Sequence, residues 1–326
     1  MTCGNHGGTG PARREFLARI CGGTAALAAG AMAGFPSALR SGDAPAPAAK
    51  LPTIRLGKFE VTRLVAGANP VGGWSHATPD LSADMVEYFT HERTVEFLLR
   101  CEQEGINTWQ ADHFERQVKA LQAAREKGSK LQFICLHHEK RPADLKTVIR
   151  DTAPIAIVHH GGVTDELFRQ GKGDQVRDFV KRVHDLGILA GVSAHNPDNI
   201  RRIADAGWEN DFFMTCFYQV SRTVEEQRKL LGRALVHEAF IETDPQEMTE
   251  VILKVPKPCL GFKILAAGRR CWNPADVEDC FKYAFGRLKR ADGVIVGMFP
   301  KHRDQIRENA ALTSKYGASI PQVGKA

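Results

Sequence analysis

The sequence lacks a strong charge of either sign. In 326 residues, 44 Lys and Arg stand against 38 Asp and Glu, a formal net charge of +6. Residues 1–48 carry +2 of this excess and the rest of the chain only +4, too little to indicate a nucleic-acid-binding protein. Aromatic residues are few, at 8 %, but 43 % hydrophobic and 25 % charged residues are typical of a globular protein. A disordered, collagen-like or coiled-coil chain is therefore excluded.

Several motifs are also missing. No two cysteines are separated by two residues, so the spacing typical of a structural zinc site is absent. No Gly-x-Gly-x-x-Gly follows the first predicted strand, which argues against a dinucleotide-binding open sheet. Beyond the N-terminal region, no apolar run is long enough to cross a bilayer.

The N-terminal region has the composition of a targeting segment. Arg13-Arg14 precedes a weakly hydrophobic run rich in Ala and Gly, which resembles a twin-arginine export signal. Ala46-Pro47-Ala48 offers a cleavage site, so we expect a signal peptide at residues 1–48 and a linker at 49–55. The resemblance implies the twin-arginine export machinery as a partner and a periplasmic or other extracytoplasmic location. An uncleaved anchor is the alternative, although Gly and Ala dominate where a stable span has Leu, Ile and Phe.

Six cysteines follow the expected cleavage site. Cys135, Cys216 and Cys259 lie in apolar, strand-like runs, where we expect buried thiols that behave as small hydrophobic groups. Cys271 and Cys280 flank a predicted turn and helix start and are the candidate pair for one disulfide.

Short apolar runs alternate with amphipathic segments eight times after residue 61. The runs are mostly continuous rather than alternating, which is typical of parallel strands covered on both faces. Eight strand–helix repeats in about 250 residues predict an α/β fold, a (β/α)8 TIM barrel, as a single domain over residues 56–326. A doubly wound open sheet is the second fold that the alternation allows. The predicted strands are Thr62–Gly67, Ile106–Gln110, Leu131–Leu136, Ile155–His159, Leu189–Ser193, Phe212–Cys216, Cys259–Leu265 and Gly293–Gly297.

The functional face of such a barrel is built from the C-terminal strand ends and the loops that follow them. Six of the twelve histidines fall at the ends of four consecutive predicted strands. His159 is our main candidate, because a neutral imidazole can exchange a proton with a substrate oxygen. Strand alternation leaves only one histidine of each adjacent pair facing inward, and we expect these to be His137 and His159 rather than His138 and His160. The alternative is that each is a structural histidine bonded to a loop carbonyl.

Lys263 is an ionisable residue in an otherwise apolar predicted strand. Burial lowers the pKa of an amine and favours a base, a Schiff-base nucleophile or a partner for an anion. A lysine that points outward between helices is the alternative. With Gln110 and Asp112 at the end of the second strand, the catalytic candidates are His159, Lys263, Gln110, Asp112 and His137. A weaker hypothesis is a divalent metal held by Asp112, His137, His159 and His195.

Several segments resemble the aldo/keto reductase superfamily. They are Leu64-Val65-Ala66-Gly67, Gly105-Ile106-Asn107, Val158-His159, Gly191-Val192-Ser193, and Val296-Gly297-Met298 followed by Gln305–Asn309. The resemblance covers residues 52–316 and implies a barrel oxidoreductase that reduces a carbonyl or sugar substrate with NADP(H). It also implies cofactor contacts from Ser193, Asn196, Gly297, Lys301, Arg303 and Asn309.

The family's catalytic tetrad is incomplete in this chain. Gln110 stands at the aspartate position, His113-Phe114-Glu115 replaces the tyrosine region, and Leu136-His137 replaces the lysine, which leaves His159 alone. Two other functions therefore stay open. One is a non-redox isomerase, lyase or hydrolase for carbohydrate-like substrates, with Trp74, Trp109 and Tyr218 available to stack on a sugar. The other is a non-catalytic binding barrel.

Overall fold

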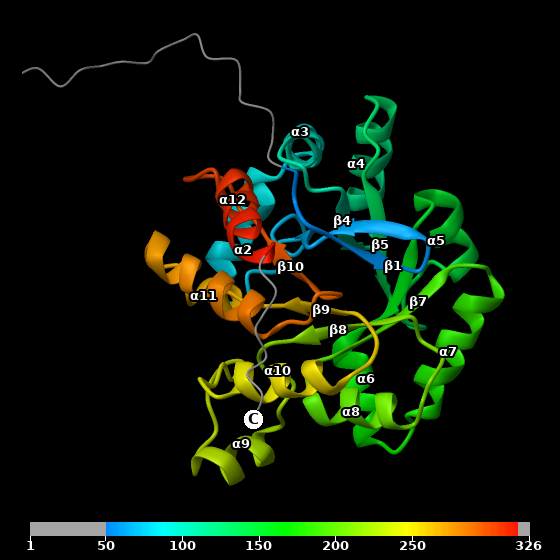
Figure 1. Ribbon diagram of the computed structural model, residues 1–326, viewed down its shortest axis with the longest axis vertical. Helices are drawn as coiled ribbons and strands as arrows, with labels where there is room; N and C mark the ends of the chain where they lie inside the picture. Colours follow the sequence, from blue (N-terminus) through cyan, green and yellow to red (C-terminus); the bar gives the residue numbers. More distant parts are fainter. Residues whose placement is uncertain (1–49, 319–326) are drawn as a thin grey trace, which may run out of the picture. The chain divides into compact units, whose positions relative to one another are not determined.

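The computed structural model describes residues 50–318. Eight parallel strands close into a barrel in the order β10-β3-β4-β5-β6-β7-β8-β9, so the last strand pairs with the first (Figure 1). This confirms the predicted (β/α)8 TIM barrel. The barrel strands are β3 (Leu64–Gly67), β4 (Thr108–Asp112), β5 (Gln132–His137), β6 (Ala156–His159), β7 (Leu189–Ala194), β8 (Phe212–Cys216), β9 (Cys259–Phe262) and β10 (Gly293–Gly297).

All eight predicted strands are present, two of them with the predicted bounds and the others shifted by a few residues at one or both ends. Two of these differences affect how the chain is divided. The first predicted strand is divided, because Thr62 ends β2 and β3 begins at Leu64. The seventh stops at Phe262 instead of Leu265. Lys263 has φ +58°, a left-handed conformation that does not continue a strand.

Helices surround the barrel (Figure 1). The starts of α8 and α11 are set by local sequence, because the side chains of Asn196 and Asn273 cap these helices and each asparagine is followed by proline. The helices are α2 (Pro79–Tyr88), α3 (His91–Gln103), α4 (Glu115–Glu126), α5 (Leu145–Thr152), α6 (Gly161–Arg169), α7 (Asp174–Asp185), α8 (Pro197–Asp205), α9 (Val224–Leu231), α10 (Asp244–Lys254), α11 (Pro274–Arg287) and α12 (Gln305–Gly317), with a short 3-10 turn at Ala266–Gly268.

Two apolar layers follow from strand alternation. Val65, Ile134 and Val158 belong to a cluster inside the barrel. Their strand neighbours Ala66, Cys135 and Ile157 belong to a larger cluster between the strands and the helices. Which layer a residue joins therefore depends on its parity along the strand.

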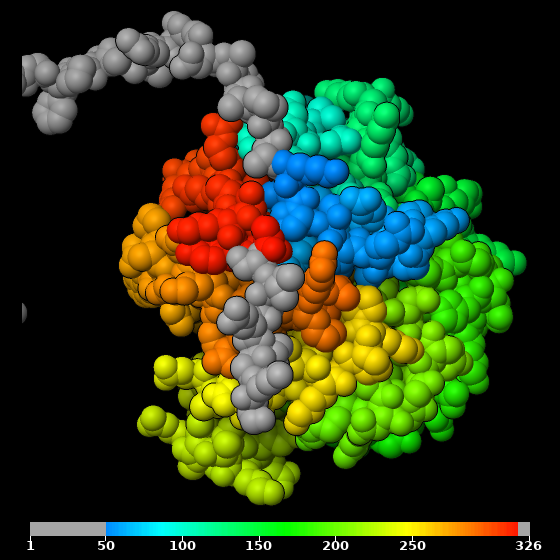
Figure 2. All heavy atoms as spheres, viewed as in Figure 1, coloured from blue at the N-terminus to red at the C-terminus, as the bar shows by residue number. Residues whose placement is uncertain are grey.

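An antiparallel hairpin, β1 (Thr53–Leu56) and β2 (Phe59–Thr62), closes the N-terminal end of the barrel. Ile54, Leu56 and Val61 belong to the same apolar cluster as the inner barrel side chains. In the space-filling view the hairpin forms the blue patch on the near face of the molecule (Figure 2). The open end of the barrel is therefore the opposite, C-terminal end. Because β1 begins inside residues 49–55, the segment expected to be a linker is partly a strand.

Two further expectations concern the cysteines and the N-terminal region, and the connection after β8 adds an observation. Cys135, Cys216 and Cys259 are buried free thiols as predicted, and Cys271 and Cys280 are also free rather than joined in a disulfide. The long connection after β8 contains a helix of its own, α9. The predicted signal peptide, residues 1–48, lies outside the described residues. Between residues 50 and 318, no helix is long and apolar enough to cross a membrane.

Candidate active site

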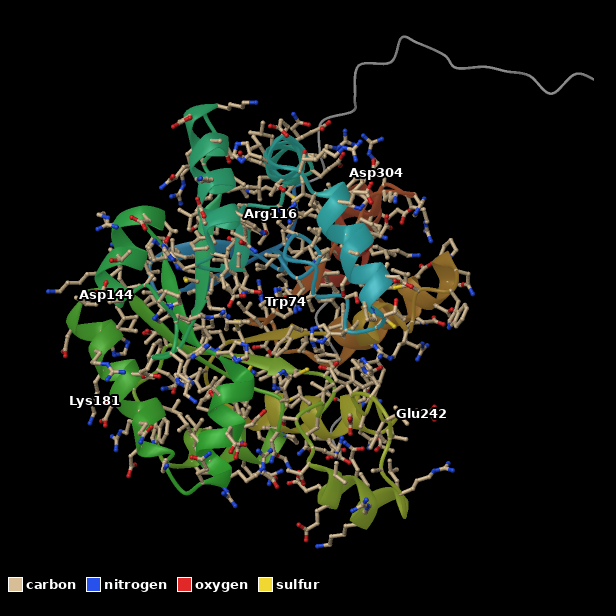
Figure 3. All side chains as sticks on the ribbon, turned by 180° about the vertical axis from the view of Figure 1, so that it is seen from behind. Trp74, Arg116, Asp144, Lys181, Glu242 and Asp304 are labelled. Carbon is tan, nitrogen blue, oxygen red and sulfur yellow. The ribbon has the colours of Figure 1, made fainter. Side chains whose placement is uncertain are left out.

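A cavity of about 650 Å³ opens at the C-terminal ends of the barrel strands. Its volume lies in the range of small-molecule and cofactor sites. Trp74, 54 % exposed, lies in the loop after β3 at the cavity mouth, seen from behind in Figure 3. Strand-end residues from seven of the eight strands line it: Gly67, Gln110, Asp112, Leu136, Ser193, Met214, Phe262, Ile295 and Gly297.

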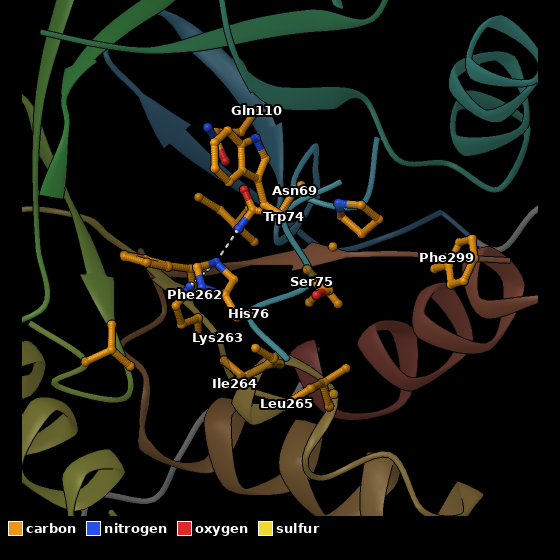
Figure 4. A pocket seen from close by; sticks show the side chains of 18 of the residues that line it. Asn69, Trp74, Ser75, His76, Gln110, Phe262, Lys263, Ile264, Leu265 and Phe299 are labelled. Atoms are coloured by element: carbon orange, nitrogen blue, oxygen red, sulfur yellow. Dashed lines mark hydrogen bonds between the residues drawn. The ribbon is translucent and has the colours of Figure 1, made fainter. Parts of the chain in front are cut away.

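Lys263, His76 and Glu238 form a hydrogen-bonded chain in this cavity. Nζ of Lys263 lies 2.8 Å from Nε2 of His76, and Nδ1 of His76 lies 3.0 Å from Oε2 of Glu238. The amide nitrogen of Asn69 lies 3.2 Å from the same Nε2, as Figure 4 shows. Because Nδ1 of His76 donates to the carboxylate, Nε2 is left to accept from Lys263.

The pKa values of Lys263 and Glu238, the two ends of this hydrogen-bonded chain, are shifted from their ordinary values. Burial lowers the pKa of Lys263, while the negative charge of Glu238 partly opposes the shift. Burial alone would raise the pKa of Glu238, but the hydrogen bond from His76 and the nearby positive charge of Lys263 outweigh it, so that pKa is lowered. A lysine with a lowered pKa beside an ionised glutamate releases its proton more readily than an exposed lysine does.

A second acid–base pair, Asp165 and His195, contributes to the same cavity. Nδ1 of His195 lies 3.0 Å from Oδ2 of Asp165, and the His195 ring lines the cavity with Nε2 free of protein partners among the described residues. The Asp165 carboxylate is 3 % exposed and also accepts from the amides of His195 and Asn196 and from the Asn199 side chain. Burial opposes its ionisation, but these hydrogen bonds hold its pKa below the usual value. The buried carboxylate therefore fixes the His195 ring, with Nε2 toward the cavity.

Asp112 lines the cavity but is already paired. Its carboxylate accepts from the guanidinium of Arg141, which also lies 4.4 Å from the Phe114 ring centre. Burial raises the pKa of Asp112, and Arg141 partly offsets that effect. Gln110, 8 % exposed, faces the cavity with no side-chain hydrogen bond to any residue of the described chain.

The expectation that His137 and His159 face inward is wrong. His159 is fully buried between the barrel and α7, its ring centre 4.9 Å from that of Phe179 and its Nδ1 2.8 Å from Oγ1 of Thr164. His137 stacks on the same Phe179 ring at 6.3 Å. Both follow the outward parity of Cys135 and Ile157, so neither can reach a ligand in the cavity.

His160 faces the cavity instead of His159. It lines the cavity directly after β6, and its Nδ1 is buried without a hydrogen-bond partner in the described residues. Burial, followed by the nearby His195, His138 and Arg141, lowers the pKa of His160 to about 3. His160 is therefore a neutral imidazole at ordinary pH.

The metal hypothesis does not fit this geometry. Asp112 and His195 line the cavity, whereas His137 and His159 lie behind the strands. Within residues 50–318, no group of three or more His, Cys, Asp or Glu side chains is arranged to hold a metal ion. The same parity applies to Trp109, which is fully buried in the outer layer and cannot stack on a ligand.

The predicted cofactor contacts divide into two groups. Ser193, Gly297, Arg303 and Asn309 line the cavity. Asn196 caps α8 and Lys301 pairs with Asp84, and neither of them lines the cavity. Arg303 lines it while pairing with Glu308. Asn309 is 3 % exposed, and its amide makes no hydrogen bond within the described chain, as expected of a group kept for a ligand. The cavity thus brings together four of the six predicted cofactor contacts.

Sequence reasoning missed three of the acid–base residues. His76 belongs to a polar run after the first strand, but nothing in the sequence links it to Lys263, 187 positions away. Glu238 lies in the long connection after β8, and Asp165 lies inside α6. The only available signal for Asp165 was a charged residue on the buried side of an amphipathic helix.

Comparisons with known proteins bear on the fold. No family model and no curated protein matches this sequence. Among solved structures, a candidate 2,5-diketo-D-gluconic acid reductase B is similar, with a TM-score of 0.51 and 8 % identity over 81 % of this chain and 86 % of that one. A Gox0644 variant in complex with NADPH has a TM-score of 0.46 and 13 % identity, over 81 % and 88 % of the two chains. The N-acetylmannosamine-6-phosphate 2-epimerase from Clostridium perfringens has a TM-score of 0.41 and 14 % identity, over 72 % and 85 %. The likeness to the reductase shows a shared barrel fold.

Proposed function

We propose that this protein is an NADP(H)-dependent oxidoreductase that acts on the carbonyl or hydroxyl group of a small, sugar-like substrate. The observation that carries the proposal is the contact between Lys263 and His76 in the cavity. Carbonyl reduction needs an acid beside the carbonyl oxygen, and the family's tyrosine is missing here. Lys263 takes that role, since its lowered pKa brings proton release toward neutral pH.

Other residues of the cavity orient Lys263 and bind the substrate and the cofactor. His76 and Glu238 hold the Lys263 amine in place and share its proton. Gln110 offers an amide to a second substrate oxygen, and Trp74 offers an apolar face at the mouth to a sugar ring. Gly297, Arg303 and Asn309 would hold NADP(H), which supplies the hydride when bound.

Nucleotide binding and substrate turnover test this proposal separately. Titration of the full chain with NADPH, followed by protein fluorescence, should give saturable binding that Asn309→Ala weakens. Oxidation of NADPH is then followed with a panel of keto-sugars and sugar aldehydes. Lys263→Met should reduce turnover by about 10²- to 10⁴-fold, whereas Lys130→Met, at an exposed lysine, should leave it unchanged. Absence of nucleotide binding by the wild-type protein would overturn the redox assignment.

A cofactor-free isomerase is the second candidate, and the Asp165–His195 pair specifically favours it. Two separate acid–base units in one cavity can move a proton between neighbouring carbons of a hydroxy-carbonyl substrate, one unit at the carbon and the other at the oxygens. The test is incorporation of solvent deuterium into hydroxy-ketones and aldoses without nucleotide, followed by ¹H NMR. Incorporation that His195→Gln abolishes would select the isomerase over the oxidoreductase.

We also propose that the protein is exported by the twin-arginine pathway. The support is the Arg13-Arg14 pair and the weakly hydrophobic run that follows it. Replacing both arginines by lysine should retain the protein in the cytoplasm of a host that has this pathway, as cell fractionation would detect. Equal export of the wild type and the variant would contradict the proposal.

A further inference from the structure

The N-terminus of α6 opens directly into the cavity. Helix α6 begins at Gly161, immediately after His160, and no side chain caps it. The first helical hydrogen bond is donated by the amide of Thr164, so the amides of Gly161, Gly162 and Val163 have no partner in the described chain. Gly161 and Gly162 line the cavity. Free amides at the positive end of a helix dipole favour an anion.

The hydroxyl of buried Ser193 and the buried Nδ1 atom of half-buried His160, both at this helix end, also lack hydrogen-bond partners among the described residues. Ser193 is 1 % exposed and lines the cavity, and its hydroxyl makes no hydrogen bond to any described residue. A Cβ placed on Gly161 would lie 2.8 Å from Oγ of Ser193, so this hydroxyl is next to the first turn of α6. His160 folds over Gly162, with Cε1 3.4 Å and the unpartnered Nδ1 3.6 Å from a Cβ placed there. Buried hydroxyl and imidazole groups without partners indicate a missing ligand.

The electrostatic surroundings favour a negative ligand. His195, His138 and Arg141 all act to lower the pKa of His160, in addition to the larger effect of burial. The two carboxylates nearby are already satisfied, since Asp165 accepts from His195 and Asn199, and Asp112 accepts from Arg141. Unpaired donors attract an anion, and the partners of the two carboxylates reduce the repulsion that these carboxylates exert on it.

We infer that the first turn of α6, with Ser193 Oγ, is a binding site for an oxyanion group of the substrate, either a carboxylate or a phosphate. This inference rests on the proposed function and narrows its substrate class to anionic carbonyl compounds, such as sugar acids or sugar phosphates. The oxyanion lies at α6, and the carbonyl group extends toward Lys263 across the same cavity. Glycine at position 161 is required, because a Cβ there would meet Ser193 and lie 3.1 Å from Cε1 of His195.

The test is oxyanion binding without turnover or nucleotide. The full chain is titrated by calorimetry with inorganic phosphate and, separately, with acetate, at constant ionic strength with chloride as the reference anion. At least one of the two should bind saturably to the wild-type protein. Ser193→Ala should weaken that binding about tenfold, because it removes one hydrogen bond to a charged group. Gly161→Ala should abolish it by filling the site.

Matched controls separate a local effect from a folding defect. Ser221→Ala removes a different hydroxyl from the same cavity and should leave oxyanion affinity unchanged. Circular dichroism establishes that each variant is folded, and Ser193→Ala decides the matter if Gly161→Ala does not fold. Preference for phosphate assigns a phosphorylated substrate, and preference for acetate assigns a carboxylate. Absence of saturable binding, or equal binding by wild type and Ser193→Ala, overturns the inference, whatever the result of the separate NADPH titration.

Discussion

Nζ of Lys263 lies 2.8 Å from Nε2 of His76, and both residues have left-handed backbone conformations, with φ +58° and +55°. Such conformations are uncommon for residues with a Cβ and cost on the order of 1–3 kcal/mol each. Strain of this kind persists only where the surrounding structure fixes it, and it concentrates at functional sites. Here the hydrogen bonds of His76 with Glu238 and Asn69 hold the backbone in place.

The first prediction concerns the protonation of Lys263. Because burial lowers its pKa, Lys263 should lose its proton at a lower pH than the exposed lysines of the chain. Two-dimensional NMR of protein with ¹³Cε-labelled lysine would follow each titration, and the signal missing from Lys263→Met identifies the residue. An assigned signal that titrates together with those of exposed lysines would contradict the proposed acid.

The second prediction concerns Glu238. Its negative charge raises the pKa of Lys263, so Glu238→Gln should lower that pKa further. In the same NMR titration the Lys263 signal should move to lower pH, and in a turnover assay the alkaline limb of the pH profile should shift in the same direction. Glu242→Gln, at an exposed neighbour in the same loop, should change neither. A Lys263 titration unaltered by Glu238→Gln would show that the two charges are not coupled.

The barrel was predictable because its strands are continuous apolar runs. β8, for example, is buried at all five positions, so its sequence shows a strand covered on both faces. When both faces of a strand are apolar, however, the hydrophobic pattern does not show whether its odd- or even-numbered residues face the barrel interior. His159 and His160 are neighbours in the sequence, yet one packs on Phe179 and the other lines the cavity.

The acid–base residues were harder to predict because loops and distant helices supply them. Lys263 was identifiable as a charge in an apolar run. His76 and Glu238 become meaningful only when two loops meet over the barrel, and they are 162 positions apart. Asp165 acts from the first turns of α6 on a histidine that follows the next strand. Local sequence contains no information on such contacts.

The third prediction concerns the buried carboxylate of Asp165. Asp165→Asn should destabilise the protein by about 3–5 kcal/mol at pH 7, because it removes one member of a buried, hydrogen-bonded pair. The pKa of Asp165 is lowered in the folded state. The stabilisation by its carboxylate is therefore fully present above the pKa of aspartate in the unfolded chain, about 4, and is lost as pH falls through the pKa in the folded state. Urea unfolding at several pH values measures this difference, with Asp174→Asn at an exposed position as the control. A difference that stays constant from pH 7 down to pH 2 would contradict the assignment.

The last prediction concerns His137, which the structure places behind the strands. Burial lowers its pKa to about 4, so the folded protein resists protonation of this ring more than the unfolded chain does. The stability linked to neutral His137 is therefore complete above pH 6.5 and is lost as pH falls toward 4. In His137→Leu the loss of unfolding free energy between pH 7 and pH 4 should be smaller than in the wild type by about 2–3 kcal/mol. At pH 7 the unfolding free energy should change little, because the buried Nδ1 of His137 has no hydrogen bond to lose. Urea unfolding at pH 7, 5.5 and 4 compares the two proteins. Since His137 does not reach the cavity, NADPH and oxyanion affinities should be the same for the wild type and His137→Leu. Weaker binding by His137→Leu would contradict the placement of His137 outside the site.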